Sequence, residues 1–109
     1  MTAMLMITTA GNEEQAATIA RELVGRRLAA CVNVVPGIRS FYRWQGKICD
    51  DGELLLIIKT MASEVEAVTR AIRDLHSYDL PEILAFEVSA GEPAFLEWLA
   101  TSVGPEADG

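Results

Sequence analysis

The chain has 109 residues, the size of one domain, and half of them are apolar. Its 16 acidic and 9 basic residues give a net charge of −7, which repels phosphate backbones, makes nucleic acid a poor candidate partner and permits cations. No apolar run is long enough to cross a membrane, and the N-terminus lacks the basic start of a signal peptide, so we expect a cytoplasmic protein with no membrane partner.

A buried strand and a capped helix are predicted at the N-terminus. Ala3–Thr9 is apolar and β-branched, as buried strands are. Asn12 and Gln15 then resemble a capping box, in which Asn12 caps the helix and Gln15 reaches back. Apolar residues at helical spacing continue the helix to about Arg27, where basic side chains suit the negative end of the helix dipole.

A long β-hairpin is predicted next. Ala29–Trp44 is one extended stretch, and Pro36-Gly37 interrupts it, which indicates an edge position or a bulge. Gln45-Gly46 makes a tight turn plausible because glycine tolerates positive φ, and Lys47–Thr60 returns along the first strand.

The second half of the chain predicts a helix, a short strand and a last helix. A second capping box at Ser63–Glu66 opens a helix, which ends at the break Ser77–Pro81. A strand follows at Ile83–Val88, and the last helix has Pro93 in its first turn. The first six elements follow the ferredoxin-like βαββαβ order. We therefore expect an α+β sandwich with a four-stranded antiparallel sheet, both main helices on one face and an extra C-terminal helix. Residues 1–103 form one domain in this prediction, and 104–109 form a flexible tail.

The hairpin geometry predicts self-association. A straight Ala29–Trp44 would span roughly 50 Å, whereas a compact chain of this length has a radius of gyration of about 13 Å. The overshooting part, Ile38–Trp44 with Lys47–Leu54, carries aromatic residues and is marginal alone in water. A copy of the same chain is the simplest cover. The alternative is that the strand bends back onto its own sheet at Pro36-Gly37.

The same hairpin separates the two cysteines. With the turn at Gln45-Gly46, Tyr42 lies near Cys49 and Cys31 lies near Thr60, so about 36 Å of strand separates the sulfurs. A disulfide needs Cα atoms within about 7 Å, so we expect two unpaired thiols.

Three blocks of residues resemble one known family. They are Arg27–Asn33 with Pro36; Ser40, Tyr42, Trp44, Gly46-Lys47 and Ile58–Thr60; and Leu75–Tyr78, Pro81–Ile83, Gly91, Leu96 and Trp98. From Met4 to about Leu99 the chain resembles the CutA divalent-cation tolerance family. The resemblance implies a ferredoxin-like fold, a homotrimer with intersubunit sheets, and a link to tolerance of copper and other divalent metals, with no required cofactor and no established reaction.

The resemblance also points to metal ligands. Some family members hold the metal with a Cys in the first strand and two adjacent His at the end of the second helix, and the corresponding residues here are Thr8, Leu75 and His76. Only His76 matches, and one imidazole does not make a tight copper site. Cys31 is a second, soft candidate ligand. The simpler alternatives are that His76 caps a helix and that Cys31 is a buried core residue.

A second set of residues suggests a cleft or an interface. Lys59 ends the most apolar run of the chain, so its charge needs a partner, for which Glu82 is the candidate. With Tyr42, Trp44 and Tyr78, this pair is predicted either to line a cleft for a small anion or metabolite or to form an interface salt bridge.

Catalysis finds little support, because no nucleophile-elbow, phosphate-loop or zinc-protease motif is present. The leading hypothesis is a non-enzymatic trimer that binds copper or another divalent cation weakly. The alternative is a signalling trimer, similar to the PII proteins, that binds a small molecule between subunits. A stable scaffold is the third option.

Overall fold

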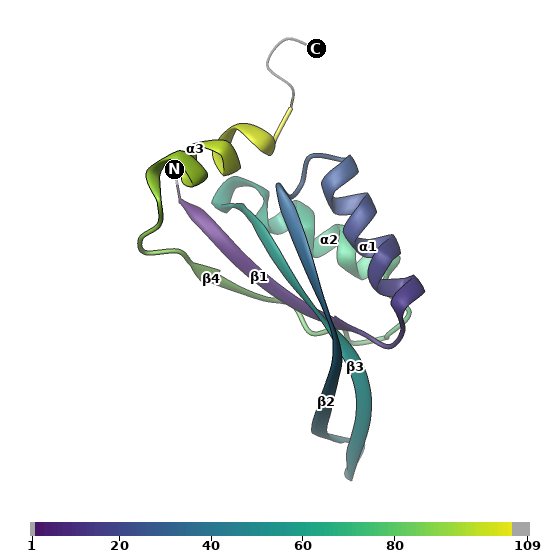
Figure 1. Cartoon of the computed structure of the whole chain (residues 1–109). Helices are drawn as coiled ribbons and strands as arrows, with labels where there is room; N and C mark the ends of the chain where they lie inside the picture. Colours follow the sequence, from purple (N-terminus) through teal and green to yellow (C-terminus); the bar gives the residue numbers. More distant parts are fainter. Residues whose placement is uncertain (1, 106–109) are drawn as a thin grey trace.

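A computed structural model describes residues 2–105 and confirms the predicted order of elements (Figure 1). The strands are β1 (Ala3–Ala10), β2 (Cys31–Trp44), β3 (Lys47–Met61) and β4 (Leu84–Glu87), and the helices are α1 (Glu13–Gly25), α2 (Val65–Leu75) and α3 (Pro93–Ser102). In this described part, no helix is long and apolar enough to cross a membrane.

The four strands form one antiparallel sheet in the order β2-β3-β1-β4, and α1 and α2 cover one of its faces (Figure 1). Alternate residues of β1 and β3 point into this layer, including Met6, Leu56 and Ile58, and they pack with Ile19 and Ile72 of the two helices. This arrangement confirms the predicted ferredoxin-like fold.

Two details of helix capping differ from the prediction. Asn12 Oδ1 accepts the Gln15 backbone N–H at 2.8 Å as expected, but the Gln15 side chain does not reach back to Asn12. Its amide instead hydrogen-bonds to two backbone groups at the end of α2, the Leu75 carbonyl and the Ser77 N–H. The second capping box is also absent, because Ser63 lies in a 3-10 turn (Ala62–Glu64) and its hydroxyl donates to Glu64 Oε2 at 3.1 Å.

The hairpin turn lies where predicted, with φ of 49° at Gln45 and 77° at Gly46. Tyr42 faces Cys49 as expected. A register shift between Val35 and Ile38 confirms the bulge at Pro36-Gly37, and beyond it Cys31 faces Lys59 rather than Thr60. The bulge adds one residue to β2, which the simple count from the turn did not include.

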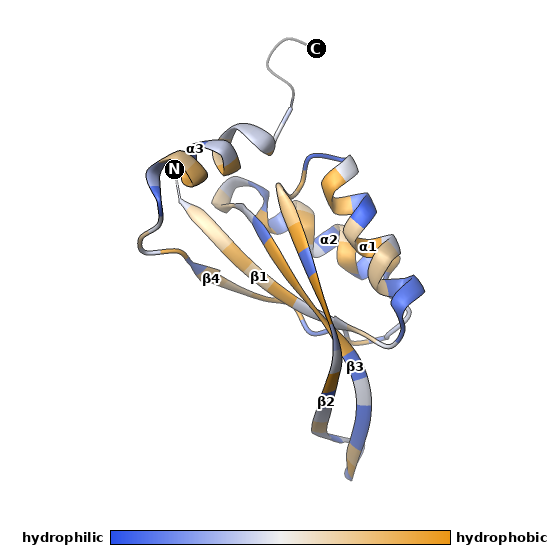
Figure 2. Ribbon diagram, viewed as in Figure 1, coloured by the Kyte–Doolittle hydropathy of each residue, from blue (hydrophilic) through white to orange (hydrophobic). Residues whose placement is uncertain are grey.

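The end of the hairpin extends beyond the sheet, and we call Ile38–Trp44 with Lys47–Leu54 the arm (Figure 1). It makes the molecule elongated, with extents of 49, 28 and 22 Å. Figure 2 shows apolar residues concentrated along the strands within the sheet, whereas much of the arm is hydrophilic. The strand therefore does not bend back at Pro36-Gly37. Both thiols are free, as predicted.

The first residue of the predicted tail is hydrogen-bonded to the domain. Arg27 Nε donates to the Gly104 carbonyl at 2.7 Å, and the Gly104 N–H donates to the Arg27 carbonyl at 2.8 Å. Arg27 Nη2 also reaches the Thr101 carbonyl at 2.9 Å. Gly104 is thus tied to the domain. Residues 106–109 of the predicted tail lie outside the described residues.

Candidate functional site: an acidic and aromatic cavity

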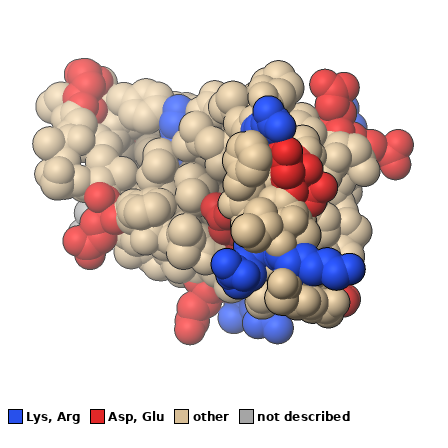
Figure 3. Space-filling model, turned by 90° about the horizontal axis from the view of Figure 1, so that it is seen from below, with Lys and Arg blue, Asp and Glu red and all other residues tan. Residues whose placement is uncertain are grey.

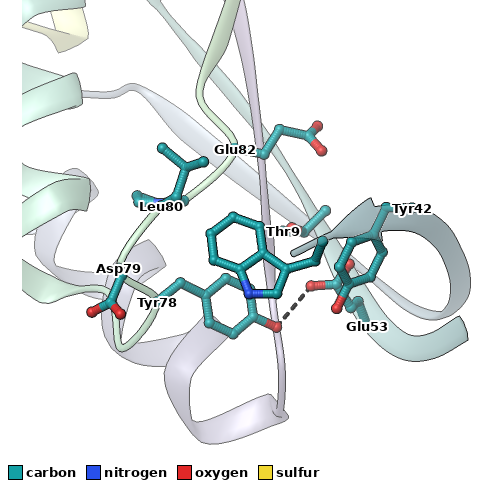
Figure 4. Close-up of a pocket in the computed structure, with 9 residues that line it drawn as sticks. Thr9, Tyr42, Glu53, Tyr78, Asp79, Leu80 and Glu82 are labelled. Atoms are coloured by element: carbon teal, nitrogen blue, oxygen red, sulfur yellow. Dashed lines mark hydrogen bonds between the residues drawn. The ribbon is translucent and has the colours of Figure 1, made fainter. Parts of the chain in front are cut away.

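A cavity of about 500 Å³ opens where the arm leaves the sheet (Figure 4). Its lining comes from the end of β1, both strands of the arm and the loop between α2 and β4, and consists of Thr9, Tyr42, Trp44, Glu53, Tyr78, Asp79, Leu80, Pro81 and Glu82. The bulge and tight turn position the arm residues, and the break after α2 supplies the loop residues. A volume of this size suits a small ligand.

Two tyrosines on different elements donate to carboxylates of β3. Tyr78 Oη donates to Glu53 Oε2 at 2.7 Å, and Tyr42 Oη donates to Asp51 Oδ2 (Figure 4 draws the first of these bonds). Asp51 and Glu53 are two residues apart on one strand, so they share a face of the arm. The first bond ties the loop after α2 to the base of the arm, and the second joins the two strands of the arm.

The cavity carries negative charge. Three carboxylates, Glu53, Asp79 and Glu82, line it, and none of the described lining residues is Lys or Arg. Basic residues do occur on the arm, where Arg39 and Asp50 form an exposed ion pair at 2.8 Å, and Figure 3 shows basic and acidic side chains side by side at this end of the molecule. The hydrogen bond from Arg39 lowers the pKa of Asp50. The cavity itself therefore favours cations over anions.

The environment of Tyr78 leads us to predict that the stability of the protein falls at high pH. Burial, followed by the hydrogen bond to Glu53, raises the pKa of Tyr78 from 10.0 to about 12. Because the folded state holds this proton at higher pH than the unfolded chain does, the contribution of Tyr78 to stability is complete below about pH 10 and is lost as the pH rises through about 12.

Absorbance titration of tyrosinate checks this pKa directly. The chain has two tyrosines, so Tyr42→Phe leaves Tyr78 as the only one. We expect an alkaline midpoint near 12 in this variant and a lower midpoint after Glu53→Gln is added, because the amide no longer provides an anionic acceptor. A midpoint near 10 in both variants would show that neither burial nor Glu53 perturbs the phenol.

His76 and Gln15 hold the loop that forms one wall of the cavity. His76 is buried, with Nε2 at 2.6 Å from the Thr9 carbonyl and Nδ1 accepting the Tyr78 N–H at 3.1 Å, so its neutral tautomer carries the proton on Nε2. Gln15 Nε2 donates to the Leu75 carbonyl at 3.1 Å, and its Oε1 accepts the Ser77 N–H at 2.9 Å.

Four of the five predicted cleft or interface residues meet in this cavity, namely Tyr42, Trp44, Tyr78 and Glu82. Lys59 does not join them. Its Nζ lies 5.7 Å from the centre of the Phe95 ring, and the described part of the chain contains no ion pair between Lys59 and Glu82. The two side chains are therefore not paired within one chain, and a salt bridge between subunits stays a prediction. The ammonium group of Lys59 lies over the face of the Phe95 ring, as in a cation–π contact, rather than beside a carboxylate.

The two predicted metal ligands do not lie together. Cys31 faces Lys59 on β3, whereas Thr9, the residue bonded by His76, faces Leu55 on the opposite side of that strand. Four residues along β3 correspond to about 13 Å. Both His76 nitrogens are hydrogen-bonded, so a metal would have to displace one partner. Over residues 2–105, no group of three or more His, Cys, Asp or Glu side chains gathers as a metal site.

Several cavity residues were absent from the sequence-based prediction. Glu53, Asp79 and Leu80 line the cavity, and Asp51 binds Tyr42 at its edge. The spacing of Asp51 and Glu53 could have predicted that both carboxylates lie on one face of the strand, since residues two apart share a face. The position of the loop residues depends on tertiary packing after α2 and had no local signal.

Comparisons with known proteins agree on one family. Residues 4–102 match the family model described as CutA1 divalent ion tolerance protein. The divalent-cation tolerance protein CutA of Thermus thermophilus is 44% identical over 100 residues, which cover 92% of this chain and 97% of that protein. Protein CutA of Mus musculus is 47% identical over 91 residues, which cover 84% of this chain and 51% of the mouse protein. The chain thus spans about half the length of the mouse relative.

Solved structures give the same result. The divalent cation tolerance protein Cut A1 of Thermus thermophilus superposes with a TM-score of 0.92 at 43% identity, covering 94% of this chain and 99% of that one. CutA1 of Oryza sativa also superposes with a TM-score of 0.92, at 41% identity and 94% coverage of both chains. Similar proteins carry the words chloroplastic, in Arabidopsis thaliana, and periplasmic, in Archaeoglobus fulgidus, so the cytoplasmic location of this chain stays a prediction.

Proposed function

This chain belongs to the CutA1 divalent ion tolerance family, and on that premise we propose that it binds copper or another divalent cation weakly, as a non-enzymatic homotrimer that acts in the response to metal ions. The observation that carries the proposal is the cavity at the base of the arm, where Glu53, Asp79 and Glu82 provide carboxylates without a basic residue among the described lining. Carboxylate oxygens are ligands for divalent cations, and hard cations prefer them.

Weak binding is the form that this geometry supports. The carboxylates line one cavity, but no three acidic, His or Cys side chains of the described residues gather closely enough to chelate an ion. A cation held there keeps much of its hydration, as ions bound by one or two carboxylates do. His76 and Cys31 stay secondary candidates for a softer copper site, and His76→Gln and Cys31→Ser test them in the titration below.

Self-association is supported by the sheet face opposite α1 and α2. Large apolar side chains are exposed on β4 and α3, namely Leu84, Phe86, Phe95 and Trp98. Two further features favour contact with a partner chain: β2 and β4 are open edges of the sheet, and beyond its base the arm extends away from its own domain (Figure 1). In the proposed homotrimer, neighbouring copies of the chain would cover these surfaces.

The small-molecule signalling hypothesis is the weaker alternative. It was based on Lys59 together with the aromatic residues as the lining of a cleft between subunits, and within one chain Lys59 lies against Phe95, outside the aromatic cavity. The names of the similar proteins describe tolerance of divalent cations rather than a reaction, which supports a non-enzymatic role.

Calorimetric titration with copper(II) tests the metal proposal. We expect weak, saturable binding that Glu53→Gln reduces roughly tenfold, because one of the nearby negative charges is lost. Glu14→Gln is the matched control, since it makes the same change in net charge at an exposed position on α1, away from the cavity. Equal losses in both variants would indicate a nonspecific effect of net charge and would contradict a site in the cavity.

A further inference from the structure

The cavity has a feature that a metal ion does not use, which is its aromatic wall. Tyr42, Trp44 and Tyr78 line it together with the three carboxylates, and all three rings are partly exposed. Three rings gathered around one cavity offer it apolar, electron-rich faces that a ligand can contact.

We propose that this cavity binds a small organic ammonium ion, with an alkylated nitrogen placed against the rings of Tyr42, Trp44 and Tyr78 and its charge balanced by Glu53, Asp79 and Glu82. Aromatic rings attract cations through their negatively polarised faces, and cages of such rings bind quaternary ammonium groups. The inference goes beyond the proposed metal function and does not depend on it.

The hydrogen bonds of the two tyrosines prepare them for this role. Each phenol donates its proton to a carboxylate, Tyr78 to Glu53 and Tyr42 to Asp51. Donation to an anion polarises the phenol and makes its ring more electron-rich. The ring of Tyr78 is also held in place, because it packs against His76 with centroids 4.4 Å apart, and it remains 38% exposed toward solvent and the cavity.

The lining selects against other ligand classes. An anion meets three carboxylates and no cationic side chain among the described lining residues. A neutral apolar molecule gains contact with the rings but leaves the carboxylates without a counter-charge. A strongly hydrated metal ion gains nothing from the rings, because its water shell keeps it away from their faces. An alkylated ammonium is weakly hydrated and carries the required charge.

Two-dimensional NMR of the full chain with tetramethylammonium as the probe tests this inference. The chain has two tryptophans, and each indole N–H gives a separate signal. We expect the Trp44 signal to shift saturably in the millimolar range while the Trp98 signal stays fixed. The neutral analogue tert-butanol, of similar shape, and sodium chloride at equal ionic strength serve as controls.

Variants test the contact with the aromatic rings. Trp44→Leu should weaken tetramethylammonium binding roughly tenfold, read from the remaining backbone signals. Trp98→Leu is the matched control, because Trp98 is 46% exposed against 43% for Trp44 but lies outside the cavity. Glu53→Gln should weaken both ligands.

Failure of this inference is distinguishable from failure of the metal proposal. No saturable shift of Trp44, an equal shift with tert-butanol, or equal effects of the two tryptophan variants would overturn the organic-cation site whatever copper(II) does. Saturable binding of tetramethylammonium without any copper(II) binding would sustain this site and overturn the proposed metal function alone.

Discussion

Replacing Phe86 with glutamate should convert the proposed homotrimer into monomers at micromolar concentration. Phe86 is 49% exposed on β4, on the sheet face that neither α1 nor α2 covers, and Leu84, two residues before it on the same strand, shares this face. Burying a phenylalanine contributes up to about 3 kcal/mol per subunit, and a carboxylate placed there must lose its water without a partner. The effect is repeated in every subunit, so this is the largest change that we predict.

Sedimentation velocity over a range of protomer concentrations measures this effect. Val24→Glu is the control, because Val24 is 43% exposed but lies on α1, on the other side of the sheet. We expect the control to keep the assembly of the unmodified chain. If Phe86→Glu sediments like the unmodified chain, the face of β4 and α3 is not the subunit interface.

Replacing His76 with alanine should lower the free energy of unfolding by about 2–4 kcal/mol. The side chain is only 8% exposed and bonds two backbone groups, the Thr9 carbonyl and the Tyr78 N–H. The alanine leaves both without a side-chain partner and removes the ring that supports Tyr78. We therefore expect the loop after α2 to lose its fixed position along with this stability.

Urea denaturation at one fixed protomer concentration checks this value, because the stability of an oligomer depends on concentration. His76→Gln is the informative companion, since its amide provides both a donor and an acceptor and should recover part of the loss. A change below about 0.5 kcal/mol for His76→Ala would mean that the two hydrogen bonds do not hold the loop.

The sequence predicted the features that depend on local chemistry. Gly46 marked the turn, Pro36-Gly37 marked the bulge, and the element order led to the observed antiparallel sheet. Strand alternation also allowed Tyr42 and Cys49 to be paired across the arm. Each of these follows from backbone preferences of a few neighbouring residues.

Features that depend on distant packing were missed. The Gln15 side chain met the end of α2, sixty residues away, instead of its own helix cap. Lys59 was expected to need a carboxylate, but α3 brings the Phe95 ring to it. Glu53 gained its role only because the loop after α2 places Tyr78 beside it. Local patterns do not encode which of several possible partners tertiary structure supplies.

The central claim is that divalent cations bind at the base of the arm, and paramagnetic broadening by manganese(II) tests it most directly. Added in small amounts to the isotope-labelled full chain, the ion should first broaden the NMR signals of Trp44, Glu53 and Tyr78, which line the acidic cavity. Broadening that begins at Cys31, or that spreads evenly over the acidic surface, would contradict the account.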